Sequence, residues 1–239
     1  MTSTASNIDQ SEVAQFDALS HQWWDTDGPL RTLHDLNPVR SDYIAERSGT
    51  LAGKRVIDVG CGGGILSEAL AQRGANVTGI DMSAQALATA RLHLYESGHQ
   101  VDYQHVRAED FADTNAQQFS VVTCLELLEH VPQPESTIAA CAALAAPGAD
   151  LFFSTIHRNI KAYLFAILGA EYALGLLPRG THDYQRFIKP SELERESRRH
   201  GLQLMHMTGL SYNPLTHRAA RTRDVAVNYI MHLSKPDAG

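Results

Sequence analysis

The feature that most constrains the fold is a regular alternation of β-branched and amphipathic segments, which begins at Lys54. Strand-like segments read RVIDVG, NVTGID, VDYQHV, FSVVTC and DLFFST, and helical spacing of apolar residues recurs between them. Successive parallel strands need a crossover connection, which a helix supplies. We therefore expect a doubly wound α/β fold with a mostly parallel sheet. Two late segments, LQLMHMT and VAVNYIMHL, predict a terminal antiparallel pair.

Charge and cysteine content narrow the possible partners and compartment. The net charge of −7 argues against nucleic acid as a partner, because phosphate-binding proteins present excess positive charge. Three widely spaced cysteines, Cys61, Cys124 and Cys141, show no disulfide framework. We expect a reduced, intracellular compartment.

Two regions interrupt or precede the alternating pattern. Residues 1–12 read as a flexible polar tail without a secretory signal, and residues 13–50 as an N-terminal helical cover. Residues 51–239 form the expected α/β domain. Within it, the alternation lapses at about 158–190, where an apolar helical insert is predicted.

A glycine-rich loop predicts a nucleotide-like ligand. The segment VIDVGCGGG ends the first predicted strand, and its glycines Gly60 and Gly62 allow a ligand to approach the backbone. Asp81 ends the second predicted strand, where a carboxylate can accept hydrogen bonds from ribose hydroxyls. The third glycine of a dinucleotide fingerprint is replaced by Ile65, which disfavours an NAD-dependent oxidoreductase. Asp58 suits the ammonium of S-adenosylmethionine better than a pyrophosphate.

The segment CLELLEHV carries the chemistry-bearing side chains Glu126, Glu129 and His130. If the chain is helical there, the three share one face. Three interpretations stay open: His130 with Glu129 as an acid/base apparatus, all three as ligands of Mg²⁺ or Zn²⁺, or the two glutamates as partners of a helix dipole.

Several of these motifs resemble a known family. VIDVGCGGG, VTGIDMS and CLELLEHV are similar to the signature segments of class I S-adenosylmethionine-dependent methyltransferases, which have a Rossmann-like sheet. The segments at 23–44, 152–159, 169–193 and 209–215 resemble the ubiquinone-biosynthesis O-methyltransferase family. The resemblance implies O-methylation of a ring hydroxyl on polyprenylated phenols or catechols.

The resemblance also implies contacts between particular residues and the cofactor S-adenosylmethionine. Arg40, Gly60, Asp81 and Leu125 are carried over by position, with Arg40 binding the methionine carboxylate. The cofactor set is completed by the neighbouring motif residues Asp58, Gly62 and Met82. For the adenine amine, Glu109 and Asp110 remain alternatives.

The insert and the implied substrate together predict peripheral membrane contact. Residues 162–177 are almost entirely apolar and are flanked by basic residues, a pattern that suits docking of the segment 160–180 to an anionic membrane surface. The resemblance implies a cytoplasmic enzyme at the inner membrane, in contact with other quinone-synthesis enzymes. Two alternatives remain: a methyltransferase of the same fold with another small or lipid acceptor, and a non-catalytic lipid-binding protein.

Overall fold

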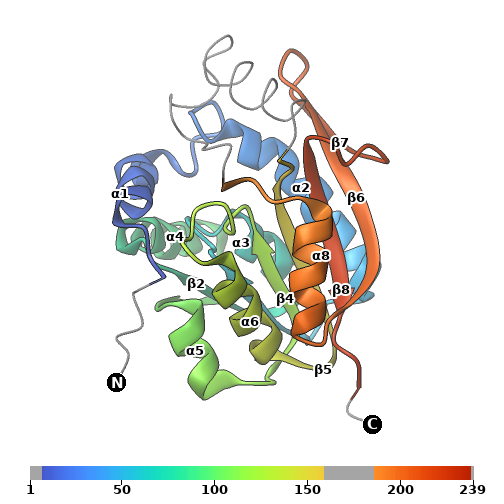
Figure 1. Ribbon diagram of the computed structural model, residues 1–239. Coiled ribbons are helices and arrows are strands. Elements are labelled where there is room, and N and C mark those ends of the chain that lie inside the picture. Colours follow the sequence, from blue (N-terminus) through green and yellow to red (C-terminus); the bar gives the residue numbers. More distant parts are fainter. Residues whose placement is uncertain (1–6, 159–185, 238–239) are drawn as a thin grey trace.

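The structure is a computed structural model that describes residues 7–158 and 186–237. In the described part, eight strands form one sheet in the order β3-β2-β1-β4-β5-β8-β6-β7 (Figure 1). The strands are β1 (Arg55–Val59), β2 (Asn76–Asp81), β3 (Val101–His105), β4 (Phe119–Leu125), β5 (Ala145–Ile156), β6 (Gln203–Asn213), β7 (Arg218–Thr222) and β8 (Asn228–Ser234). The first five are parallel, whereas β8 is antiparallel to both β5 and β6. The predicted parallel sheet with a terminal antiparallel pair is therefore confirmed.

Helices cover both faces of this sheet. One face carries α2 (Arg31–Ser48), α3 (Ile65–Gln72) and α4 (Ala84–Ser97), and the other carries α5 (Ala108–Asn115), α6 (Pro134–Leu144) and α8 (Pro190–Arg199) (Figure 1). Helix α1 (Gln10–Leu19) and the 3-10 helix η1 (Ser20–Gln22) precede them and lie beside α4. This is the doubly wound arrangement that crossover connections between parallel strands require.

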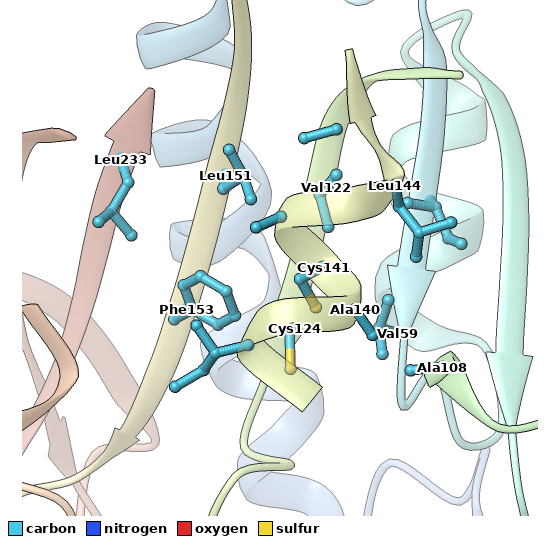
Figure 2. Packing of buried hydrophobic residues seen from close by; sticks show 14 of the residues in the cluster. Val59, Ala108, Val122, Cys124, Ala140, Cys141, Leu144, Leu151, Phe153 and Leu233 are labelled. Atoms are coloured by element: carbon cyan, nitrogen blue, oxygen red, sulfur yellow. The ribbon is translucent and has the colours of Figure 1, made fainter. Parts of the chain in front are cut away.

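The core behind the site is a dry apolar layer between α6 and the central strands. Figure 2 shows Cys141 of α6 beside Cys124 on β4, with Leu144 of α6 and Phe153 of β5 in the same apolar layer, all of them fully buried. This layer fixes the carboxyl end of β4, from which the chain continues into the CLELLEHV segment. All three cysteines are buried free thiols.

The start of β5 differs from the prediction. Strand β5 begins at Ala145, directly after the end of α6 at Leu144, whereas the predicted segment DLFFST begins only at Asp150, so Pro147-Gly148 lies inside the strand. Lys235, the residue after β8, continues the antiparallel pairing between β5 and β8. The Gly148 N–H donates to the Lys235 carbonyl at 2.8 Å, and the Lys235 N–H donates to the Ala149 carbonyl at 2.9 Å. Gly148 has a φ of +73°, which glycine adopts without strain.

Two further boundaries need correction. Strand β7 was not predicted; it pairs with β6, whose residues 209–213 extend beyond the predicted LQLMHMT segment. The flexible tail was predicted to span residues 1–12, but residues 7–12 are folded: Asn7 is buried and α1 begins at Gln10.

The segment predicted to contact the membrane lies outside the described residues. Most of the predicted insert, 159–185, is not described. Within 7–158 and 186–237, no helix has the length and apolar character needed to cross a bilayer.

Candidate active site

The carboxyl ends of β1, β2 and β4 lie at one edge of the sheet and border a single large cavity. Strand β1 lies between β2 and β4. The chain adds β2 and β3 on one side of β1 and then crosses to add β4 and β5 on the other side, and ligands bind at this switch point in open α/β folds. The cavity has a volume of about 1120 Å³ and is also lined by residues of α1 and α2. It exceeds the roughly 300–1,000 Å³ of a typical small-molecule pocket, so it can hold more than one ligand.

The glycine loop between β1 and α3 is pressed against the N-terminal cover. A Cβ atom at Gly63 would lie 2.2 Å from the Trp23 ring, and a Cβ atom at Gly62 would also lie 2.2 Å from it. Trp24 donates from Nε1 to the Gly63 carbonyl at 2.9 Å. Gly60 and Gly62 both have positive φ and line the cavity. The glycines therefore serve close packing of the cover as well as access to the backbone.

Asp58 lies inside the cavity wall near the end of β1. Its two carboxyl oxygens accept hydrogen bonds from Ser67 Oγ and Thr123 Oγ1, each at 2.7 Å. Burial raises the pKa of Asp58, and these two hydroxyls partly offset the rise. The carboxyl group is therefore rigidly held at a position where a cationic ligand would be favoured.

Asp81 is organised by backbone amides of two loops. Its Oδ2 accepts from the Gly62 N–H at 2.8 Å, and its Oδ1 accepts from the Ser83 N–H at 2.7 Å. Burial raises the pKa of Asp81, while the amides favour the ionised form. Both Asp81 and its neighbour Met82 line the cavity.

Arg40 lies on α2 and is 6% exposed, so it is not a solvated surface arginine. Its Nη2 donates to Glu126 Oε1 at 2.8 Å, whereas its Nε makes no hydrogen bond to any described residue. A buried donor without a partner is costly, and an anionic ligand in the cavity would satisfy it. Leu125, the last residue of β4, lines the same cavity.

The helical interpretation of Glu126, Glu129 and His130 is wrong. The chain between β4 and Pro134 forms turns, and Glu126 has a φ of +53°, a left-handed conformation that no helix continues. The Glu126 N–H donates to the Ser154 carbonyl at 3.0 Å, which holds this conformation. Neither glutamate therefore interacts with a helix start at this position, because α6 begins only at Pro134.

The arrangement also does not fit the predicted metal triad. Glu126 Oε1 accepts from Arg40, from Ser154 Oγ at 2.7 Å and from Asn228 Nδ2 at 3.1 Å. Among the described residues, no group of three His, Cys, Asp or Glu side chains is placed to hold a metal ion. Glu126 pairs with Arg40, Glu129 is buried outside the cavity lining, and His130 pairs with Glu12, so the three side chains do not converge on one metal position.

Glu129 is buried away from the cavity. It is 3% exposed, it is not among the cavity-lining residues, and neither carboxyl oxygen hydrogen-bonds to a described residue. Burial raises its pKa to about 7, and the charge of Glu126 adds to the rise. This position contradicts the predicted role of Glu129 as a catalytic group that contacts substrate.

His130 lines the cavity and is paired with a residue from the N-terminal helix. Its Nδ1 lies 3.0 Å from Oε2 of Glu12, and its side chain is 11% exposed. Burial opposes the charged imidazolium, but the hydrogen bond with Glu12 and the charge of Glu129 outweigh it and raise the pKa of His130. The predicted acid/base residue is therefore present at the cavity, but with a different carboxylate.

Glu109 and Asp110, the two candidates for contact with the adenine amine, lie in different surroundings. Glu109 lines the cavity, and its Oε1 accepts from Asn7 Nδ2 at 2.7 Å. Asp110 points elsewhere and pairs with Arg107. The geometry therefore favours Glu109.

Sequence reasoning missed Glu12, Asn7 and Asn228. The spacing of Asp9 and Glu12 is that of a helix N-cap followed by an acid three residues later, a signal that starts α1 earlier than position 13. Asn228 is the polar first residue of β8, ahead of the apolar run 229–231, and it lines the cavity.

The chain is similar to known methyltransferases. Residues 33–207 match a family described as a methyltransferase domain. A ubiquinone biosynthesis O-methyltransferase from Azoarcus sp. (strain BH72) is 59% identical over 96% of this chain and 98% of that protein. The protein of the same name from Pseudomonas aeruginosa (strain UCBPP-PA14) is 58% identical over 96% of this chain and 99% of its own length.

Solved structures show the same fold at low sequence identity. The magnesium protoporphyrin IX methyltransferase from Synechocystis PCC 6803, with bound SAH, has a TM-score of 0.65 at 18% identity. The match covers 93% of this chain and 94% of that one. Together with the near full-length relatives, these matches mean that the chain belongs to the ubiquinone biosynthesis O-methyltransferase family.

Proposed function

We propose that this chain transfers the methyl group of S-adenosylmethionine to a ring hydroxyl of a polyprenylated phenol or catechol in ubiquinone biosynthesis. One observation carries the proposal: the predicted cofactor residues and His130 line a single cavity. Since relatives of this chain are named ubiquinone biosynthesis O-methyltransferase, we propose a ring with a polyprenyl tail as its substrate.

The cofactor residues fit the groups of S-adenosylmethionine. The buried Nε of Arg40, which has no hydrogen-bond partner among the described residues, suits the methionine carboxylate, and Asp58 suits the ammonium. Asp81 suits the ribose hydroxyls and Glu109 the adenine amine. Carboxylates outnumber the arginines Arg40 and Arg107 among the described lining residues, which favours a cationic ligand over a pyrophosphate.

His130 is the proposed general base. A phenol with a pKa near 10 is a weak nucleophile at neutral pH, so removal of its proton activates the oxygen. When bound, S-adenosylmethionine supplies an electrophilic methyl group on a sulfonium. His130 accepts the hydroxyl proton on its imidazole as the ring oxygen takes the methyl group, so the positive charge of the sulfonium is replaced by that of the imidazolium, and the largely apolar cavity excludes water from this step.

Steady-state kinetics with a short-chain prenyl catechol test the base. His130→Ala should lower kcat by about 10²–10⁴-fold, the usual contribution of general base catalysis, without changing SAH affinity. An unchanged kcat would remove His130 from the mechanism.

The proposal includes peripheral contact with the inner membrane through residues 160–180, on the cytoplasmic side and near other quinone-synthesis enzymes. A polyprenyl tail resides in the bilayer while the ring must reach the cavity, and the apolar segment between basic residues supports such contact. Flotation with anionic liposomes tests it: Ile167→Glu combined with Leu168→Glu should reduce binding. Equal flotation of variant and wild type contradicts membrane contact through this segment.

A further inference from the structure

Glu12 and His130 come from distant parts of the chain but meet at the cavity. They are 118 residues apart in sequence, and their side chains are 18% and 11% exposed. Phe16, one helical turn after Glu12, lies edge-on to the imidazole with ring centroids 5.2 Å apart. All three side chains line the cavity. Helix α1 therefore contributes one wall around the imidazole.

The contact is fixed by an anchor at the beginning of the described chain. Asn7 is 7% exposed and its side-chain amide is surrounded by hydrogen-bonding partners. Its Nδ2 lies 2.7 Å from Glu109 Oε1, 3.0 Å from the Gln133 carbonyl oxygen and 3.1 Å from Thr137 Oγ1, and its Oδ1 accepts from the Gln133 N–H at 2.7 Å. Gln133 follows His130 by three residues, so the anchor holds α1 against the same turn that carries the imidazole.

The second oxygen of Glu12 is also engaged. Glu12 Oε1 accepts from Arg186 Nη1 at 3.2 Å, and Arg186 Nη2 donates to Asp9 Oδ2 at 2.8 Å. Asp9 in turn caps α1 by accepting from the Ser11 N–H at 3.1 Å. The Glu12 carboxylate is therefore held between a guanidinium and the imidazole, which restricts its rotation.

We propose that Glu12 is the positioning residue for His130: it orients the ring and keeps the Nδ1 proton in place, so that Nε2 is the basic nitrogen. A carboxylate at one ring nitrogen of histidine selects the tautomer in this way and stabilises the imidazolium that forms when the other nitrogen accepts a proton. The inference rests on the proposed function of His130 as general base.

A double-mutant cycle with the full-length enzyme tests this role. Glu12→Met, which keeps side-chain length but removes both oxygens, should lower kcat at least about tenfold with KM for both substrates nearly unchanged. Glu12→Gln retains an acceptor and should lose less. In a His130→Ala background, Glu12→Met should cause no further loss, because its effect passes through the imidazole.

A matched control and an independent readout separate positioning from folding. Glu196 also holds one arginine and one histidine, Arg199 and His200, but lies outside the cavity, so Glu196→Met should leave kcat unchanged. Nitrogen-15 NMR of labelled histidine should show His130 protonated at Nδ1 in the wild type and a mixture of tautomers in Glu12→Met.

The possible outcomes are distinguishable. An unchanged kcat in Glu12→Met, or equal losses with and without His130, would overturn the positioning role. An unchanged kcat in His130→Ala alone would instead overturn the proposed base. Loss of SAH binding in Glu12→Met would show that the residue supports the fold of the cavity, which also contradicts the proposal.

Discussion

Arg40 and Glu126, 86 residues apart, form a largely buried ion pair with 2.8 Å between Nη2 and Oε1. Ser154 and Asn228 donate to the same oxygen, so one carboxylate joins α2, β5, β8 and the turn after β4. The residue expected to bind the cofactor carboxylate is thus fixed in place by a residue expected to bind a metal.

Removing this carboxylate should destabilise the fold. Glu126→Ala leaves the Arg40 guanidinium buried without its partner, which should lower the free energy of unfolding by about 3 kcal/mol, measured by urea denaturation. Glu46→Ala breaks an exposed pair with Arg221 and should cost less than about 1 kcal/mol. Equal losses for the two variants would show that the Arg40–Glu126 pair has no special structural role.

Gly63→Ala should loosen the N-terminal cover. The φ of Gly63 is not in the left-handed region, so the cost comes from the Trp23 ring, 2.2 Å from the added Cβ. We expect a loss of about 1–3 kcal/mol in unfolding free energy and a changed tryptophan fluorescence. In a Trp23→Leu background the loss should be smaller, because the smaller side chain leaves space; an undiminished loss would contradict this packing.

Glu129 should make stability depend on pH. The pKa of Glu129 is 4.5 for an unperturbed glutamate, as in the unfolded chain, and about 7 in the folded protein. Between pH 4.5 and pH 7 the folded state therefore binds more protons than the unfolded state. Unfolding free energy should therefore fall as pH rises from 4.5 to 7, by up to about 3 kcal/mol for this group. Glu129→Gln, compared with wild type by urea denaturation, should be near neutral at pH 4.5 and stabilising at pH 8. A difference that does not change with pH would contradict the raised pKa of Glu129.

The sheet and the cofactor edge could be predicted from the sequence because they depend on local patterns. Strand periodicity located β1 to β5, and the offset from Gly60 to Asp81 identified two strand ends that the fold must bring together. The contacts of Glu12 could not be predicted, since they depend on the tertiary packing of α1 against the turn that carries His130. The left-handed conformation of Glu126 likewise depends on Ser154 in a neighbouring strand, which overrides a locally helical pattern.

Two cofactor fragments can separate the roles of Asp81 and Arg40. Titration calorimetry with SAH and with methylthioadenosine, which lacks the amino-acid part, should give distinct patterns. Asp81→Asn should weaken both ligands about 10- to 100-fold, because both contain the ribose. Arg40→Met should weaken SAH alone. If Arg40→Met weakens both ligands equally, the arginine supports the cavity and does not recognise the carboxylate.

The most direct test of the central claim is to locate the transferred methyl group. The wild-type enzyme is incubated with trideuteromethyl-labelled S-adenosylmethionine and a short-chain prenyl catechol, and the product is analysed by NMR and mass spectrometry. The account predicts one deuterated methyl group on a ring oxygen for each SAH released. A deuterated methyl group on a ring carbon, or SAH release without a methylated ring, would contradict it.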